Sequence, residues 1–197
     1  MLKQLAVLAV LGTITGSTAN GQDHSAHHTS PYAGFEERKI KSLSEQDITE
    51  LQRGGGWGFA LPAELNGLPG PAHVLEHKDD LGLSMEQIVA VQAIYDEMKQ
   101  EAIDGGERFI EAEAALSRAF ESEDLSEVDL RSRIEAAEKA RADLRYVHLS
   151  RHLSTAKLMT EDQIRQYMMS RGYVEDPCTS VPEGHSAEMW RKHNGCK

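Results

Sequence analysis

Two long runs of helical periodicity, one after the other between Leu81 and Tyr173, constrain the fold of this chain more than any other feature. In the first run, apolar residues recur mostly at intervals of three and four, as in a helix with one buried face. They are Ile88, Val91, Tyr95, Met98, Ala102, Phe109, Ala112, Leu116 and Phe120. The second run carries Leu130, Ile134, Ala137, Leu144 and Val147. A turn at 121–125 joins the runs, so we expect an antiparallel helical hairpin.

Hydroxyl side chains mark the expected starts of the helices. Ser84 is followed three residues later by Gln87, and Thr160 by Gln163, and this spacing predicts a capping box at each position. The expected caps are Ser44, Ser84, Ser126 and Thr160. The sequence therefore predicts an all-α fold with four helices in total, in which short flanking helices accompany the long hairpin.

Two adjacent glycines, Gly105 and Gly106, interrupt the first long run. A glycine in a helix interior costs about 1 kcal/mol relative to alanine, so a packing reason is expected. The pair predicts either a kink or the close approach of another segment.

The segment before the hairpin is rich in glycine and proline. Its run Gly54–Gly56 lacks the lysine and serine of a phosphate loop and follows no strand, so we interpret it as a flexible connector. The apolar residues of this segment are expected to cover one end of the helices, and they are Trp57, Phe59, Leu61, Leu65 and Leu68.

The first residues have the layout of a secretory signal peptide. Lys3 precedes an apolar run from Leu5 to Leu11, and the small residues Ser17 to Ala19 fit a cleavage site. The apolar run is shorter than the roughly 20 residues that span a bilayer. We therefore expect a signal peptide over residues 1–19 and export to the periplasm, with an uncleaved membrane anchor as the alternative.

Three regions are expected after the signal peptide. Residues 20–43 are expected to form a flexible arm, because they are mostly small and polar. Residues 44–173 form the helical domain, and residues 174–197 form a flexible C-terminal tail. The arm carries His24, His27 and His28, which suit zinc, copper or nickel.

The tail contains both cysteines of the chain, Cys178 and Cys196. In an oxidising compartment a disulfide between them would persist and would contribute about 3 kcal/mol. The alternative is that both act as thiolate ligands of a metal ion.

The charge of the chain narrows the classes of partner. Asp and Glu number 32 against 21 Lys and Arg, which gives a net charge of −11. Nucleic-acid binding depends on basic contacts to phosphate, so no nucleic-acid partner is expected. The acidity suits cations or basic partners, or simply a solvated surface. The chain has no nucleophile elbow and no cofactor fingerprint, so we expect neither enzyme activity nor an organic cofactor.

The segment His73 to His77 matches the H-x-x-E-H pattern, in which two histidines hold zinc and the glutamate activates water. A zinc protease also needs a third ligand and a substrate cleft, and no downstream acidic motif supplies the ligand. We interpret the segment as a helical turn, with a metal-binding His73 and His77 pair or a zinc protease as the alternatives.

The acidic hairpin, the signal peptide and two phrases close to Leu-Thr-x-x-Gln resemble the Spy/CpxP-like periplasmic proteins. The phrases are Leu83-Ser84-Met85-Glu86-Gln87 and Met159-Thr160-Glu161-Asp162-Gln163, and each departs from the family pattern at one residue. The resemblance covers residues 31–173. It implies a hairpin-based protomer of four helices, often dimeric and without catalysis, that acts as a stress chaperone or in heavy-metal sensing and resistance.

In the metal-binding members of that family, histidines on the third helix and in the N-terminal segment are the ligands, which implies His148 and His152 here together with the arm histidines. Residues four apart on a helix face the same way, so two imidazoles can share one ion. Zinc generally takes four ligands and copper three or more, so the arm, His73, His77 or a partner chain would complete the set. The alternative is that both are partly buried residues that extend the row of Leu144.

A second candidate set lies in the tail, where His185, Met189 and His193 are spaced by four. If Ser186 to His193 is helical, these residues form one ridge whose thioether and imidazole groups suit copper. The alternative is a loosely ordered turn closed by the disulfide.

These observations favour a periplasmic heavy-metal-binding protein that acts in metal resistance, sensing or the envelope stress response. The main alternative is an ATP-independent chaperone that holds unfolded clients on the apolar face of the hairpin. The expected partners are metal ions, unfolded client proteins or a membrane sensor protein, and a second copy of the chain in a homodimer.

Overall fold

The computed structural model describes residues 30–196 of the chain. The expected signal peptide and the arm histidines His24, His27 and His28 lie outside the described residues. The chain divides into two units, residues 1–33 and 34–197, and the fold described below is that of the second unit.

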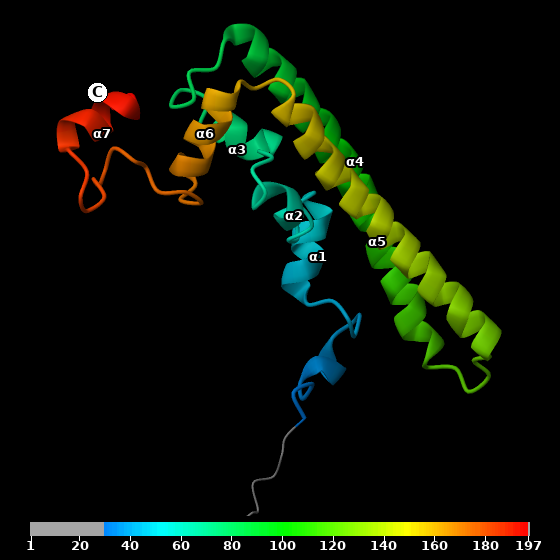
Figure 1. Cartoon of the computed structure of the whole chain (residues 1–197). Helices are drawn as coiled ribbons and strands as arrows, with labels where there is room; N and C mark the ends of the chain where they lie inside the picture. Colours follow the sequence, from blue (N-terminus) through cyan, green and yellow to red (C-terminus); the bar gives the residue numbers. More distant parts are fainter. Residues whose placement is uncertain (1–29, 197) are drawn as a thin grey trace, which may run out of the picture. The chain divides into compact units, whose positions relative to one another are not determined.

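Helices make up the regular secondary structure of the described residues, and no strand occurs among them (Figure 1). In chain order they are the short 3₁₀ helix η1 (Phe35–Glu37) and the α-helices α1 (Glu45–Gln52), α2 (Leu61–Glu64), α3 (Pro71–Glu76), α4 (Met85–Ala119), α5 (Glu127–Ala156), α6 (Glu161–Ser170) and α7 (Ala187–His193). None of these helices is long and apolar enough to cross a membrane. The predicted all-α fold class is confirmed.

The predicted total of four helices is wrong, because residues 30–196 contain seven α-helices. Two of the additional helices have a proline in the first turn, with Pro62 at the second position of α2 and Pro71 at the first position of α3. The fixed φ of proline suits the start of a helix, where its missing N–H costs no hydrogen bond. The third, α7, begins after Ser186, whose side chain accepts a hydrogen bond from the Met189 N–H.

The predicted hairpin consists of α4, with 35 residues, and α5, with 30 residues. The two helices run side by side over most of their length, joined by a turn near 120–126 (Figure 1). Side-chain caps are present at all four predicted starts, Ser44, Ser84, Ser126 and Thr160. The prediction of the long helices from periodicity and caps is therefore confirmed.

The two capping-box glutamines, Gln87 and Gln163, also bind each other, because the N-terminal ends of α4 and α6 meet. Gln87 Nε2 donates to Gln163 Oε1 at 2.9 Å, and Gln163 Nε2 donates to Gln87 Oε1 at 3.1 Å. Gln87 Nε2 also donates to the Leu158 carbonyl oxygen at 2.7 Å. The two similar phrases of the sequence therefore form one junction between α4 and α6.

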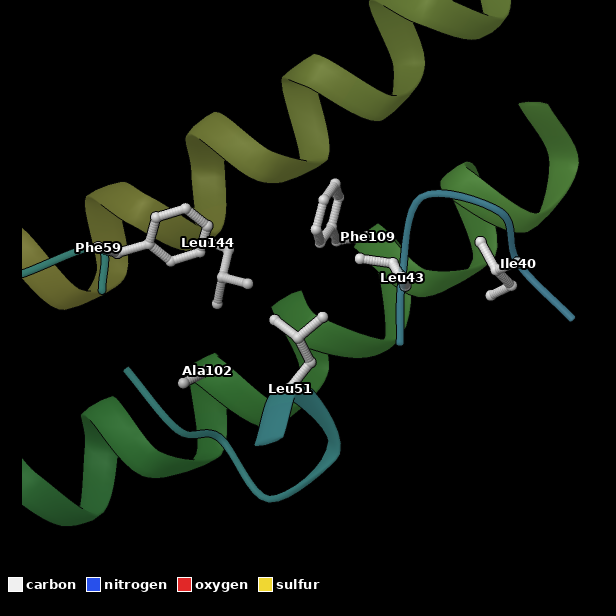
Figure 2. Close-up of a cluster of buried hydrophobic side chains, with 7 residues drawn as sticks. All are labelled: Ile40, Leu43, Leu51, Phe59, Ala102, Phe109 and Leu144. Atoms are coloured by element: carbon white, nitrogen blue, oxygen red, sulfur yellow. The ribbon is translucent and has the colours of Figure 1, made fainter. Parts of the chain in front are cut away.

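The larger of two apolar clusters lies between the middle of the hairpin and the segments on either side of α1 (Figure 2). Its buried members are Ile40, Leu43, Leu51, Phe59, Ala102, Phe109 and Leu144. Trp57 covers this cluster, with its ring centroid 5.2 Å from that of Phe59 and 5.5 Å from that of Phe109. Ile40 and Leu43 fall in the segment expected to be a flexible arm, so the packed domain begins before residue 44.

The apolar residues of the glycine-rich segment do not all cover the hairpin as predicted. Phe59 is buried against its middle, but Leu61 and Leu65 are 55% and 58% exposed, so the prediction is wrong for these two leucines. They are four residues apart on one face of α2, whose buried residues are Ala63 and Glu64.

A second apolar cluster attaches α6 to the beginning of the hairpin. Its fully or nearly fully buried members are Val74, Leu81, Val91 and Tyr167. Tyr167 has no exposed surface, so α6 packs against α3 and α4.

The apolar face of the hairpin is not buried along its whole length. Phe120 is 66% exposed and Ile134 is 44% exposed, so the prediction that both belong to the buried face is wrong. The segment before α1 reaches α4 as far as Ser117, whose Oγ accepts a hydrogen bond from the Lys41 N–H at 3.4 Å. Phe120 lies in the turn beyond this contact.

The tail is closed by a disulfide between Cys178 and Cys196, whose Cα atoms are 5.5 Å apart. Trp190 of α7 is held in the same loop, because its Nε1 donates to the Pro177 carbonyl oxygen at 2.7 Å. The predicted disulfide is confirmed, and both sulfur atoms are committed to it and are not thiolate ligands.

Gly105 and Gly106 allow two segments to approach α4 closely, which confirms one of the two predicted reasons for the pair. A Cβ atom on Gly106 would lie 2.5 Å from the Leu51 carbonyl oxygen of α1, and one on Gly105 would lie 3.1 Å from Leu144 Cδ1. The helix itself continues without interruption through both residues. Gly106 meets backbone, which cannot yield easily, whereas Gly105 meets the end of a side chain.

We expect Gly106→Ala to lower the free energy of unfolding by about 1–3 kcal/mol, because the new methyl group would force α1 away from α4. The matched control is Gly105→Ala, for which the loss is smaller, since Leu144 can shift and alanine favours a helix by about 1 kcal/mol. Urea unfolding followed by circular dichroism measures both. A Gly106→Ala variant as stable as the wild type would contradict the close approach.

Candidate functional site

Glu64, at the end of α2, is a buried carboxylate that five other side chains approach. Only 5% of its surface is exposed. Its Oε1 atom accepts hydrogen bonds from the Tyr167 hydroxyl and, at 3.2 Å, from the Tyr173 hydroxyl. His73 Nδ1 and Arg171 Nε each lie 3.5 Å from the same oxygen. Glu64 therefore links α2 to α3, to α6 and to the segment that follows α6.

These partners keep Glu64 ionised. Burial alone would raise the pKa of Glu64, but hydrogen bonds with His73 and Tyr167 and the electrostatic influence of the nearby His73 and His152 outweigh burial and lower this pKa from 4.5 to about 2. Burial, and then the hydrogen bond to the Glu64 carboxylate, raise the pKa of Tyr167, so its phenol keeps its proton.

His152, on α5, is oriented by the backbone of the segment between α2 and α3. Its Nδ1 atom lies 2.6 Å from the Leu68 carbonyl oxygen and 3.8 Å from Glu64 Oε2. A carbonyl oxygen can only accept, so Nδ1 carries a hydrogen and, in the neutral ring, Nε2 carries the lone pair. Gly70 lies against the ring, and a Cβ atom there would be 2.7 Å from His152 Nε2. The side chain is 7% exposed.

His148, one turn earlier on α5, is 3% exposed, and its Nε2 atom has no hydrogen-bond partner among residues 30–196. Its ring centroid lies 6.3 Å from that of Phe59. Burial, and then the neighbouring His152, lower the pKa of His148, so its imidazole is neutral at pH 7. A buried nitrogen without a partner is unusual, because leaving such a group unpaired costs about 1–3 kcal/mol.

The two histidines line one cavity of about 290 Å³. Its walls come from the loop after α1, the beginning of α3, the first half of α4 and the second half of α5. Met98 and Tyr95 of α4 and His73 of α3 share the lining. The alternative prediction for the histidine pair, that both are buried hairpin residues, agrees with their burial, and the cavity beside them adds a space for a ligand.

The H-x-x-E-H segment forms the predicted helical turn, α3, and its two histidines have separate carboxylate partners. His73 Nδ1 approaches Glu64, whereas His77, which follows the last residue of α3, places its Nδ1 3.8 Å from Asp80 Oδ2. Glu76 is exposed. His73 lines the same cavity as His148 and His152, and His77 does not.

The tail residues are brought together only in part. Met189 and His193 lie on α7, as predicted, but His185 precedes the Ser186 cap and packs edge-on against Trp190, with ring centroids 5.1 Å apart. Met189 is 68% exposed. The predicted ridge of three ligands is therefore reduced to two residues of the helix.

Across residues 30–196, no group of three or more His, Cys, Asp and Glu side chains is arranged to hold a metal ion. The histidine pair on α5 would need ligands of another kind, such as the Met98 thioether or a small molecule that enters the cavity.

Several residues of this site were not predicted from the sequence. Three of them, Glu64, Tyr167 and Arg171, are far apart in the chain. Only Glu64 has a local sequence signal, because an acidic residue shortly after a proline is typical of the first turn of a helix. The Leu68 carbonyl that orients His152 has no sequence signal at all, because every residue has a carbonyl group.

Comparisons with known proteins identify no relative of this chain. No family model matches the chain, and neither a curated protein nor a solved structure matches it.

We expect Glu64→Gln to lower the free energy of unfolding at pH 7 by about 3 kcal/mol, the value of a pKa shift from 4.5 to about 2. The folded-state pKa is below the unfolded value, so this contribution is complete above pH 4.5 and is lost as the pH falls towards about 2. Urea unfolding between pH 7 and pH 3 measures this dependence.

The matched control is Glu76→Gln, which removes an exposed carboxylate from α3. It should leave the stability and its acid dependence within about 0.5 kcal/mol of the wild type. Equal acid dependence in the wild type and Glu64→Gln would show that Glu64 is not the stabilising charge.

Proposed function

We propose that this chain is an exported metal-binding protein that holds one soft or borderline transition-metal ion between His148 and His152. The observation that carries the proposal is the orientation of His152, whose Nδ1–H donates to the Leu68 carbonyl at 2.6 Å, so that Nε2 carries the lone pair in the neutral ring. Metal-binding histidines typically donate their second ring N–H in this way, which fixes the tautomer and the ring orientation.

His148 supports the same proposal. Its buried Nε2 has no partner among the described residues, and its lowered pKa keeps the imidazole neutral and able to bind a metal at neutral pH. His148 and His152 are four residues apart on α5 and line one cavity, so both can reach a single ion there.

Copper(I) suits this site better than zinc or nickel. A closed zinc site needs four ligands, and no third His, Cys, Asp or Glu of residues 30–196 joins the pair. Met98 lines the same cavity, and a thioether with two imidazoles is a set that selects copper(I). Zinc and nickel remain the alternatives within the proposal.

The place of action in this proposal is the periplasm. It rests on the signal-peptide pattern of residues 1–19 and on the resemblance to the Spy/CpxP-like proteins. A role in metal resistance, sensing or envelope stress, with a second copy or a membrane sensor as partner, belongs to the same proposal.

We expect the purified chain to bind one copper(I) ion per chain in competition with a chromophoric chelator. His148→Ala and His152→Ala should each weaken this binding by about 100-fold or more, because each removes a ligand from a small set. Met98→Leu preserves the volume of the side chain and should weaken copper(I) binding while leaving any zinc binding unchanged.

His185→Ala is the matched control, because it removes a histidine of the tail that does not line the cavity. Thermal unfolding of each variant verifies that it is folded. Wild-type affinity for copper(I), zinc and nickel in a folded double variant of His148 and His152 would refute the proposed site.

A second candidate function, the holding of unfolded proteins, is favoured by the exposed apolar side chains of the hairpin. Val89 is 65% exposed, Phe120 66% and Val128 79%. Phe120 also lines an apolar hollow together with Leu116 and Lys41. Exposed apolar surface of this kind can bind non-native chains.

If the chain acts as a chaperone, equimolar protein should suppress the aggregation of a denatured client without ATP, as measured by light scattering. A variant that combines Phe120→Ser with Val128→Ser should lose at least about half of this effect, because the apolar contact area is reduced. Met189→Ser, an exposed apolar residue of α7, is the control. Unchanged scattering with several clients would exclude this function.

A further inference from the structure

The cavity beside His148 and His152 is lined by basic side chains in an otherwise acidic chain. Its basic residues are Arg53, Lys99 and three histidines, and no Asp or Glu of residues 30–196 lines it. The chain as a whole carries a net charge of −11. The lining is therefore basic whereas the protein as a whole is acidic. A basic lining attracts anions into the cavity.

Neither cation at this cavity is neutralised by a carboxylate among residues 30–196. Arg53 is exposed and makes no ion pair, and Lys99 is partly buried and donates only to the Arg53 backbone carbonyl. The glutamates of α4 that lie close by, Glu97 and Glu101, are paired with Arg151 instead. Arg53 and Lys99 thus both line one cavity and form no ion pair among residues 30–196, and a carboxylate that acts on the cavity is that of Glu50, which influences His148.

A third polar group is available inside the cavity. His148 is 3% exposed and its Nε2 atom is unpartnered. When no metal ion is bound, His148 can adopt the tautomer with hydrogen on Nε2, and this atom can then donate to an oxygen of a bound anion. An unpaired buried donor costs about 1–3 kcal/mol, and a ligand oxygen would remove that cost.

The remaining walls of the cavity are apolar or aromatic, which indicates the chemical character of the rest of the ligand. Met98, Pro71 and Ala60 are apolar, and Tyr95 presents part of an aromatic ring. The volume of about 290 Å³ admits a small molecule and is too small for a nucleotide with its base and sugar. An inorganic anion would leave the apolar walls without contacts, whereas a carboxylate on a short hydrocarbon chain satisfies both kinds of surface.

We propose that this cavity binds a small organic carboxylate, held by Arg53 and Lys99 on one side and by His148 on the other. The proposal does not depend on a bound metal ion, because it rests on the basic lining and not on the lone pairs of the histidines. Arg53 pairs with the carboxylate through its guanidinium, and Lys99 acts as a point charge.

The test is isothermal titration of the full chain, freed of metal by chelation, with succinate as the probe. We expect saturable binding with a Kd below about 1 mM. Arg53→Gln and Lys99→Gln should each weaken it by about tenfold, the value of one lost charge-assisted hydrogen bond. Arg53→Gln is the cleaner variant, because Arg53 is exposed and its side chain forms no ion pair among residues 30–196.

Three controls separate the possible outcomes. Lys157→Gln, at an exposed lysine after α5, should bind succinate like the wild type. Succinamide, the uncharged analogue, should not bind. Inorganic phosphate should bind more weakly than succinate. Absence of succinate binding, unchanged affinity in folded Arg53→Gln and Lys99→Gln, or tighter binding of phosphate would each overturn the proposal, whatever the result of the copper(I) titration.

Discussion

The buried carboxylate of Glu64 determines how the short helices are arranged. An ion of this kind cannot remain in the interior without partners, because its desolvation costs several kcal/mol. The partners come from separate segments, with His73 on α3, Tyr167 on α6, and Arg171 and Tyr173 just after α6. No single segment satisfies the charge, so α2, α3 and α6 must assemble together. The apolar cluster around Tyr167 adds hydrophobic contact to this electrostatic requirement.

The same assembly shapes the candidate site. The segment between α2 and α3 is held so that the Leu68 carbonyl meets His152 and Gly70 lies against its ring. Glu64 contributes a second acceptor 3.8 Å from His152 Nδ1. The cavity therefore depends on the partners of Glu64. Of these partners, His73 and His152 line the cavity, whereas Tyr167, Arg171 and Tyr173 do not.

The hairpin could be predicted from the sequence because its signals are local. Periodicity and caps depend on residues three or four apart, and Ser84 with Gln87 behaves as that rule predicts. α2 and α3 have only four and six residues, which is too few for a periodic pattern. Without such a pattern, the proline near the start of each helix did not suffice to predict it. The pairing of His148 with His152 was likewise local. The surroundings of the two histidines could not be predicted in this way, because Leu68 is 84 residues from His152 and no pattern in a single sequence relates them.

The reciprocal hydrogen bonds between Gln87 and Gln163 have a consequence for the two ends of α6. A capping box accepts either glutamate or glutamine, but only the amide has an N–H to give to the other helix. This junction contains no titratable group, so acid leaves it intact. The opposite end of α6 is attached through Tyr167 and Arg171 to the Glu64 carboxylate, which acid neutralises. On acidification the C-terminal end of α6 would therefore detach first, while its N-terminal end stays bound to α4 through Gln163.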